Sequence, residues 1–298
     1  MPRPPFYDTH VHFWDLSHPR LHYAWLAPGP PHPIIGDIES VKYPLYDARR
    51  FIAETSGANV VKVLHVEADV DSGDDPVEET IWLEQQAQLT GVPEGIIADT
   101  NLKSPDLERE IERHLQASAR VRGFRDFSEG DYLIDPDFAR GYALLGSYNL
   151  VCDLDCVAEN MTKARDLASR HPETAVVVDH AGFPRERTPE YFDFWKRGID
   201  ALAQAPSVWC KISGLAMCDH RWTVGSIRPW FEYCLEAFGV KRCVLGTNWP
   251  LDKAFSSYEA VLDAYWEIVS PLSPDEQADL FHANAERLFG PDRTVSQP

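Results

Sequence analysis

Short apolar runs alternate along this chain with longer amphipathic stretches. Eight runs rich in β-branched and apolar residues predict β-strands: FYDTHVHF, NVVKVLHVEA, EGIIADT, RVRGFRDF, NLVCDLDC, AVVVDHA, SVWCKIS and RCVLGTN. The stretches between them space apolar residues as helices do, and several open with Asp, Glu, Ser or Pro. They include VEETIWLEQQAQLTG, SPDLEREIERHLQA, AENMTKARDLASRH, PEYFDFWKRGIDALA and RPWFEYCLEAFG. This alternation predicts an α/β protein with a (β/α)8 TIM barrel.

Two segments depart from a simple alternation of strand and helix. SHPRLHYAWLAPGPPHPIIGDIES, after the first strand, is too long and too rich in Pro for a connector. We expect it to form a loop over the mouth of the barrel. SPDEQADLFHANAERLFG has helical spacing and a Gly stop at Gly290, which predicts a closing helix. Because no repeat or linker interrupts the pattern, we expect residues 1–298 to form a single domain.

Charge and hydropathy narrow the range of partners. The formal net charge is −19, which argues against nucleic acid, because such a partner needs a clustered basic face to displace counterions. The start of the chain lacks the apolar run of a secretory signal, and no window reaches the roughly 18 apolar residues of a membrane span. We therefore expect a cytoplasmic protein with a small-molecule substrate and no membrane partner. Association into a homo-oligomer is compatible with the fold.

The cysteines do not form a recognisable metal or redox motif. None of the six belongs to a C-x-x-C pair, and several lie inside apolar strand-like runs, where Cys usually behaves as a small buried hydrophobe. We expect structural roles for Cys152, Cys156, Cys210, Cys218, Cys234 and Cys243.

Polar residues gather where the predicted strands end, which is where such barrels carry their active sites. Taken singly, each has an ordinary explanation, since a strand-end Asp often caps the next helix and a lone His is usually structural. For Asp99 and Asp179 that explanation is as good as a functional one, and for Lys211 it is better. The joint occurrence favours an active site. The residues are His10, His12, Glu67, Asp99, Arg125, Asp153, Asp155, Asp179, His180, Lys211, Ser213 and Asn248.

An ordered set of short motifs at these strand ends resembles a known family. DTHVHFWD, HVEA, GFRDF, VVVDHAGFP, WCKISGL and GTNWPLD are together similar to the amidohydrolase superfamily, over Tyr7 to about Phe289. The resemblance is strongest to its lactonase-like branch, which includes sugar-acid lactonases and 2-pyrone-4,6-dicarboxylate lactonase. Aromatic-acid decarboxylases are more distant relatives.

The resemblance implies roles for individual residues. His10 and His12 match the first-strand H-x-H, which lines the site and binds zinc in metal-dependent members. Arg125 matches an arginine that can pair with a substrate carboxylate or carbonyl. His180 matches a histidine suited to polarising a carbonyl or donating a proton. Asn248 stands where many members carry Asp.

An amide at position 248 can act neither as a good base nor as a good metal ligand. The resemblance therefore moves the general base elsewhere, to Glu67 or Asp252 first and to Asp155 third. His10, His12 and His180 could still supply three ligands of one zinc ion. Alternatively, they could hold and polarise a substrate without a metal. The expected cofactor is thus either none or one divalent ion, with zinc favoured.

Aromatic residues near the predicted mouth could pack the loops or form a flat slot for a ring-shaped ligand. The candidates for substrate contact are Trp14, Trp25, Phe127, Phe183 and Trp249, together with Asp155. The leading functional hypothesis is a hydrolase that opens a lactone or similar cyclic ester. The alternatives are a metal-dependent decarboxylase of an aromatic acid and a non-catalytic binding protein on the same scaffold.

Overall fold

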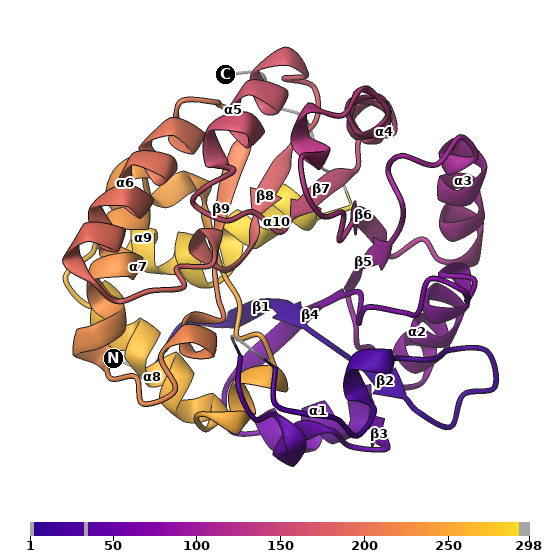
Figure 1. Ribbon diagram of the computed structural model, residues 1–298. Helices are drawn as coiled ribbons and strands as arrows, with labels where there is room; N and C mark the ends of the chain where they lie inside the picture. Colours follow the sequence, from indigo (N-terminus) through magenta and orange to yellow (C-terminus); the bar gives the residue numbers. More distant parts are fainter. Residues whose placement is uncertain (1–2, 33–34, 292–298) are drawn as a thin grey trace.

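Eight parallel strands form one sheet that curls into a nearly closed barrel (Figure 1). The computed structural model describes residues 3–32 and 35–291. All eight predicted strands are confirmed, and neighbours along the chain are neighbours in the sheet. They are β1 (Phe6–Val11), β4 (Val60–Val66), β5 (Gly95–Asp99), β6 (Val121–Arg125), β7 (Val151–Leu154), β8 (Val176–Val178), β9 (Val208–Ile212) and β10 (Cys243–Leu245).

Side chains join the first strand to the last. The Thr9 hydroxyl donates to the Leu245 carbonyl over 2.8 Å. The buried Asp8 carboxylate accepts from the Thr247 backbone N–H at 2.9 Å, the Thr247 hydroxyl at 2.6 Å and the Tyr258 hydroxyl at 2.8 Å. These bonds tie β1 to the segment that follows β10, and so close the barrel.

Helices surround the strands on the outside, as Figure 1 shows. Side-chain caps determine where helices begin. The sequence predicted that α7 would begin at Arg228, but it begins four residues earlier, because the Thr223 side chain accepts from the Ser226 N–H in a capping box. The outer helices are α1 (Ala48–Thr55), α2 (Val77–Thr90), α3 (Leu107–Ala117), α4 (Pro136–Ser147), α5 (Met161–Arg170), α6 (Pro189–Ala203), α7 (Val224–Phe238) and α8 (Tyr258–Val269).

The end of the barrel where the strands begin is closed by an apolar plug. The predicted closing helix is divided into α9 (Pro274–Ala278), a π-helical turn (Asp279–Ala283) and α10 (Asn284–Phe289). Leu288 and Phe289 of α10 pack with Leu64, Ile97 and Val244 from inside the barrel. The second and larger core lies between the strands and the outer helices.

The Pro-rich segment after β1 lies over the mouth, as predicted. It is framed by a short antiparallel pair, β2 (Trp14–Asp15) and β3 (Leu45–Tyr46). The Trp25 indole N–H donates to the Ala68 carbonyl over 2.7 Å, which fixes the segment to the chain after β4. Residues 33 and 34 of the predicted loop, and residues 1–2 and 292–298 of the expected single domain, lie outside the described ranges.

Two further expectations can be compared with the described residues. Five of the six cysteines are buried, Cys218 is half-buried, and all are free, as small core residues would be. In the part of the chain that the structure describes, no helix is long and apolar enough to cross a membrane.

Candidate active site

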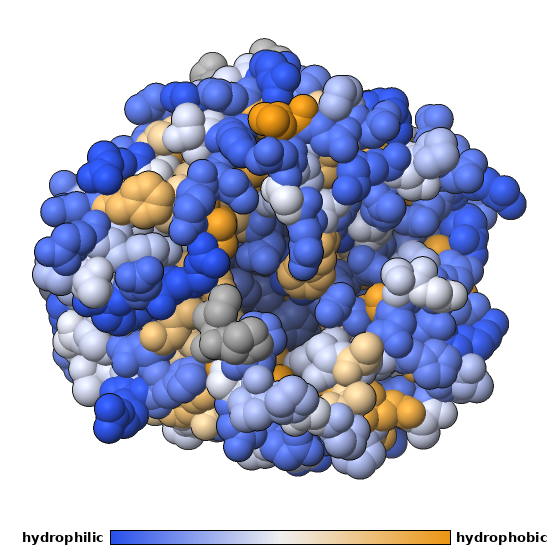
Figure 2. Space-filling view, in the orientation of Figure 1, coloured by the Kyte–Doolittle hydropathy of each residue, from blue (hydrophilic) through white to orange (hydrophobic). Residues whose placement is uncertain are grey.

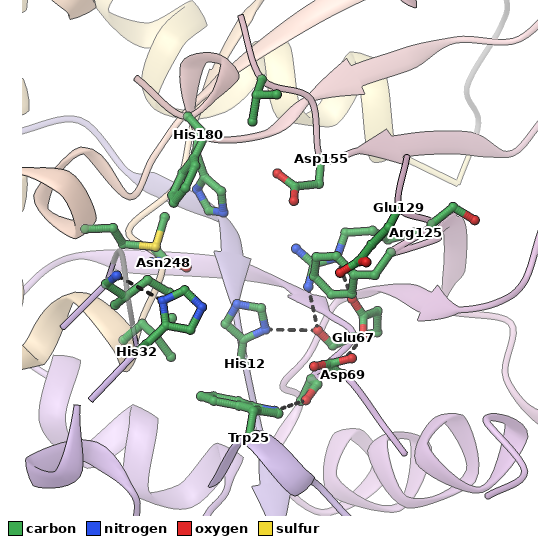
Figure 3. A pocket seen from close by; sticks show the side chains of 18 of the residues that line it. His12, Trp25, His32, Glu67, Asp69, Arg125, Glu129, Asp155, His180 and Asn248 are labelled. Atoms are coloured by element: carbon green, nitrogen blue, oxygen red, sulfur yellow. Dashed lines mark hydrogen bonds and ion pairs between the residues drawn. The ribbon is translucent and has the colours of Figure 1, made fainter. Parts of the chain in front are cut away.

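A cavity of about 680 Å³ opens at the ends of the strands, within the size range of small-molecule sites. Figure 2 shows it as a hollow near the centre of the face in view. Strand ends supply its polar lining and loops supply aromatic rings (Figure 3). Of the residues that the sequence singled out, the lining includes His12, Glu67, Arg125, Asp155, His180, Asn248, Trp25, Phe127 and Phe183.

Four of the predicted site residues lie outside the described lining. Trp14 is fully buried and donates its indole N–H to the Tyr43 carbonyl over 2.8 Å. Trp249 is also buried, and its indole donates to Glu54 over 3.1 Å. Both tryptophans therefore pack the loops instead of forming a substrate slot. His10 lies beneath the cavity against His12, and Asp252 lies behind Asn248.

Backbone carbonyls fix the proton positions of the first-strand histidines. His12 Nδ1 lies 2.9 Å from the Val66 oxygen and 3.1 Å from the Glu67 oxygen, so it must carry a proton and donate. Its Nε2 then accepts from His10 Nε2, 3.1 Å away. His10 Nδ1 is left as an acceptor. Burial lowers the pKa of both imidazoles well below the ordinary value, so both are neutral.

Arg125 is held by carboxylates of its own chain. Its Nε donates to Glu67 Oε1 over 2.5 Å, Nη2 to the Glu67 carbonyl over 2.9 Å, and Nη1 to Asp179 over 3.2 Å. Burial opposes the charge, but Glu67 and Asp179 raise the pKa of Arg125 above its usual range. The guanidinium also lies 4.3 Å from the centre of the Phe127 ring. With five N–H donors and three used in this way, Arg125 can still donate to a substrate oxygen.

Glu67 is occupied on both oxygens. Besides Arg125, it accepts from the Asp69 backbone N–H over 2.5 Å. Burial raises its pKa to about 7, although Arg125 opposes the shift. Glu67 therefore positions Arg125 and is poorly placed to activate water.

His180 sits on a backbone turn of unusual conformation. His180, Ala181 and Phe183 all have positive φ, at 52°, 54° and 45°, a region that costs non-glycine residues about 1–3 kcal/mol each. The turn is held by the Trp195 indole, which donates to the Ala181 carbonyl over 2.8 Å. A hydrogen bond of 2.9 Å joins His180 Nδ1 to the Ser213 hydroxyl. Strain of this kind is typical of functional positions.

The environment keeps the His180 ring neutral and leaves one nitrogen for a ligand. Burial lowers its pKa to about 4. Because Nδ1 is bonded to Ser213, Nε2 is the nitrogen that can meet a substrate in the cavity, into which the ring projects (Figure 3).

Asn248 also has a positive φ, 58°. Its amide nitrogen donates to Asp252 over 2.9 Å. Its oxygen is buried without a hydrogen-bond partner among the described residues. Burial raises the pKa of Asp252 to about 7. The pair therefore presents an acceptor, the Asn248 oxygen, to whatever donor enters the cavity.

Asp155 is the predicted carboxylate best placed to act on water. It lines the cavity, and its carboxylate has no hydrogen-bond donor among the described residues. Burial raises its pKa above the ordinary value, although Arg125 opposes the shift. A raised pKa makes a carboxylate a stronger base. Figure 3 shows Asp155 across the cavity from His12.

Lys211 and Asp179, for which the sequence favoured structural roles or gave even odds, form the centre of a charge cluster below the cavity. The Lys211 ammonium contacts Asp153, lies 2.8 Å from Asp179 Oδ1 and 3.5 Å from His10 Nδ1. All four side chains are fully buried. Their strand-end positions were visible in the sequence, but their pairing was not.

The donor set can be tested for a zinc ion. His10, Asp179 and His180 each offer a ligand atom within 4.8 Å of the others, and two imidazoles with a carboxylate are a set that zinc accepts. The structure thus groups Asp179, and not the predicted His12, with the other two. However, His10 Nδ1 and Asp179 Oδ1 both face the Lys211 ammonium. As arranged, these residues do not fit a bound divalent ion.

Comparison with known proteins agrees with this architecture. The family model described as amidohydrolase matches residues 7–290. The chain belongs to the amidohydrolase family. This amidohydrolase is a hydrolase of the superfamily that the sequence motifs predicted. It is 34% identical to an uncharacterized protein of Sinorhizobium fredii over 95% of this chain and 97% of that one.

Two further relatives of this amidohydrolase come from Burkholderia multivorans. The first is an L-fucono-1,5-lactonase, which is 26% identical over 95% of each chain. The second is a crystal structure of an amidohydrolase with bound zinc, similar with a TM-score of 0.81 and 25% identity over 96% of this chain and 99% of that one.

Proposed function

We propose that this hydrolase opens a neutral lactone of a polyhydroxylated acid. The observation that carries the proposal is the combination in one cavity of a free carboxylate, Asp155, with a neutral imidazole, His180, and a guanidinium, Arg125. Similarity to an L-fucono-1,5-lactonase over nearly the whole chain supports a lactone as the substrate.

The proposed reaction needs only these side chains and water. Arg125 N–H and His180 Nε2–H donate to the lactone carbonyl oxygen and stabilise the negative charge that develops on it. Asp155 takes a proton from water as the water oxygen bonds to the carbonyl carbon. The bond from the carbonyl carbon to the ring oxygen then breaks. The proton on Asp155 passes to that oxygen, which leaves as a hydroxyl and restores the carboxylate.

The charges of the cavity favour a neutral substrate. Four carboxylates line it, those of Glu67, Asp69, Glu129 and Asp155. Both arginines of the lining are already paired, Arg125 with Glu67 and Asp179, and Arg185 with Glu159 at 2.9 Å. A carboxylate on the substrate would therefore be repelled by these side chains. Sugar hydroxyls, in contrast, could donate to the carboxylate oxygens of the lining.

The aromatic residues suit the same class of ligand. Trp25, Phe127 and Phe183 line the cavity and offer flat apolar faces to the C–H face of a sugar ring. The decarboxylase alternative has less support, because it needs a cation with uncompensated charge to anchor a substrate carboxylate, and Glu67 and Asp179 already balance the charge of Arg125 even though it keeps N–H donors for a carbonyl oxygen.

A substrate panel tests the proposal. Five- and six-membered sugar lactones are compared with a pyrone dicarboxylate, and acid release is followed with a pH indicator. We expect kcat/KM for the best neutral lactone to exceed that for the dicarboxylate by at least about tenfold. His180→Ala is expected to lower kcat by about a hundredfold. Preference for the dicarboxylate, or full activity of His180→Ala, would contradict the proposal.

A further inference from the structure

Lys211 projects from β9 into the centre of the barrel, between the apolar plug and the cavity. Its side chain is fully buried, and its ammonium lies 5.9 Å from the centre of the Phe289 ring. A lysine is almost never buried to this extent unless it is paired. The ammonium donates to Asp153 Oδ2, forms an ion pair with Asp179 Oδ1 at 2.8 Å, and lies 3.5 Å from His10 Nδ1.

The contact between His10 and Asp179 explains why a cation is needed there. His10 Nδ1 and Asp179 Oδ1 lie 3.4 Å apart. The Val66 and Glu67 carbonyls fix the proton of His12 on Nδ1, and this places the proton of His10 on Nε2. His10 Nδ1 and Asp179 Oδ1 are then two lone-pair acceptors that face each other. In this tautomer a cation between the two acceptors stabilises their contact, and the Lys211 ammonium supplies it.

The charge of the cluster is also nearly balanced without a metal. Three carboxylates, those of Glu67, Asp153 and Asp179, are fully buried around two cations, Arg125 and Lys211. Asp179 contacts both cations. The formal sum is −1; a divalent ion beside Lys211 would reverse its sign to +1 and place two cations next to each other in a region of low dielectric, which is costly.

Lys211 opposes zinc at either nitrogen of His10. A metal ion at Nδ1 would occupy the position where the ammonium now sits. A metal ion held jointly by the Nε2 atoms of His10 and His12, which lie 3.1 Å apart, would move the His10 proton to Nδ1. That proton would then seek Asp179 Oδ1, 3.4 Å away, as its acceptor, and would compete for this oxygen with the Lys211 ammonium, which lies 2.8 Å from it.

We propose that Lys211 is a built-in monovalent cation that takes the position of a divalent metal in this barrel and competes with zinc for His10 and Asp179. The proposal concerns binding of the ion and does not depend on which substrate the enzyme hydrolyses.

Zinc binding by the folded protein tests this directly. Wild-type protein is treated with a chelator, dialysed against micromolar zinc chloride and then against buffer, and its metal content is measured. We expect well under one zinc per chain. Stoichiometric zinc that survives the buffer dialysis would overturn the proposal.

A charge-matched variant supplies the second measurement. Lys211→Met combined with Asp153→Asn removes one positive and one negative charge together, so Asp179 keeps its partner Arg125. We expect calorimetry to show zinc binding at least about tenfold tighter than in the wild type, with a cobalt(II) absorption band typical of a tetrahedral site. Adding His10→Ala should abolish both signals.

Two results from this series would overturn the proposal. One is zinc binding no tighter in the Lys211→Met/Asp153→Asn variant than in the wild type, with circular dichroism showing that the variant is folded. The other is tighter binding that persists after His10→Ala, which would place the ion elsewhere. If the double variant does not fold, the wild-type zinc content alone decides. None of these measurements uses turnover, so the lactonase proposal stands or fails separately.

Discussion

The two ends of this barrel are built on opposite principles. At the closed end, α10 inserts Leu288 and Phe289 among apolar strand residues such as Leu64, Ile97 and Val244. At the open end, buried charges surround Lys211, and His180 and Asn248 both have positive φ. The closed end is packed like an ordinary apolar core. The open end instead has buried charges and residues with positive φ next to the cavity. The contrast suggests that stability and function can be changed separately in this protein.

Replacing Asp155 should produce the largest effect and act on function alone. Because Asp155→Asn removes the proposed base but no hydrogen bond of the carboxylate, we expect kcat to fall about a thousandfold, or ~4 kcal/mol, with unfolding little changed. Asp131→Asn, at an exposed carboxylate paired with Lys163, serves as the control. Retention of more than about a tenth of the activity would exclude Asp155 as the base.

Replacing Phe289 at the closed end of the barrel should affect stability alone. Phe289 is 1% exposed and fills the plug, so Phe289→Ala is expected to lower the free energy of unfolding by about 3 kcal/mol through lost burial and a cavity. Denaturant titration measures this, and kcat of the folded variant should remain close to wild type. Leu89→Ala, at a residue 68% exposed, should change stability by less than about 0.5 kcal/mol. A large loss of kcat in Phe289→Ala would show that the two ends are linked.

Gly214→Ala should affect both properties, because this position joins stability to the site. Gly214 has a φ of +58°, and an added Cβ would lie 2.6 Å from His180 Nδ1. We expect a loss of about 1–2 kcal/mol in stability and a fall in kcat as the His180 ring is displaced. Gly225→Ala, whose Cβ would have only an ordinary contact at 3.7 Å in helix α7, should leave kcat unchanged and lower stability in no case, because Ala favours a helix over Gly by up to about 1 kcal/mol. Wild-type kcat in Gly214→Ala would argue against a role for the position of His180.

The last prediction concerns pH. Burial raises the pKa of Glu79 to about 8 from an ordinary 4.5, so the folded state holds this proton more tightly than the unfolded state. The stabilisation is complete below pH 4.5 and is lost as the pH rises toward 8. Glu79→Gln keeps an acceptor for the Tyr23 hydroxyl and the Ala68 N–H and removes the titration.

Unfolding of both proteins at pH 5 and pH 8 measures this effect. We expect the stability of the variant relative to wild type to be greater at pH 8 than at pH 5. The same comparison with Glu112→Gln, at an exposed residue of α3, should show no such change. An equal difference at both pH values would mean that Glu79 is charged throughout.

The fold could be predicted from the sequence because the signals for it are local. Each strand is a short apolar run, and α6 occupies the full predicted stretch from Pro189 to Ala203. The start of α7 was missed because it depends on a capping box at Thr223 rather than on apolar spacing. The seam of the barrel, where Asp8 of β1 bonds to Thr247 after β10, joins residues far apart in the chain. Local sequence patterns carry no information about such a contact.

The candidate site could be predicted only in part. Strand-end position identified Arg125, His180 and Asn248 as cavity residues, since strand direction fixes where they emerge. Position could not reveal that Trp14 and Trp249 turn away to bond with Tyr43 and Glu54, because rotamers in loops depend on neighbours distant in sequence.

The seam of the barrel has a consequence for how the chain is made. β1 finds its first partner, β4, early in synthesis, but the donors that satisfy Asp8 include Thr247, 239 residues later. Until the ribosome has released that segment, the Asp8 carboxylate cannot be buried with its partners, so the nascent barrel stays open along one edge. Release of roughly the last sixth of the chain, from Thr247 onward, is therefore the step that completes the fold. A circular permutant with new ends between α4 and β7 would bring Asp8 and Thr247 much closer along the chain, so this contact could form well before synthesis ends.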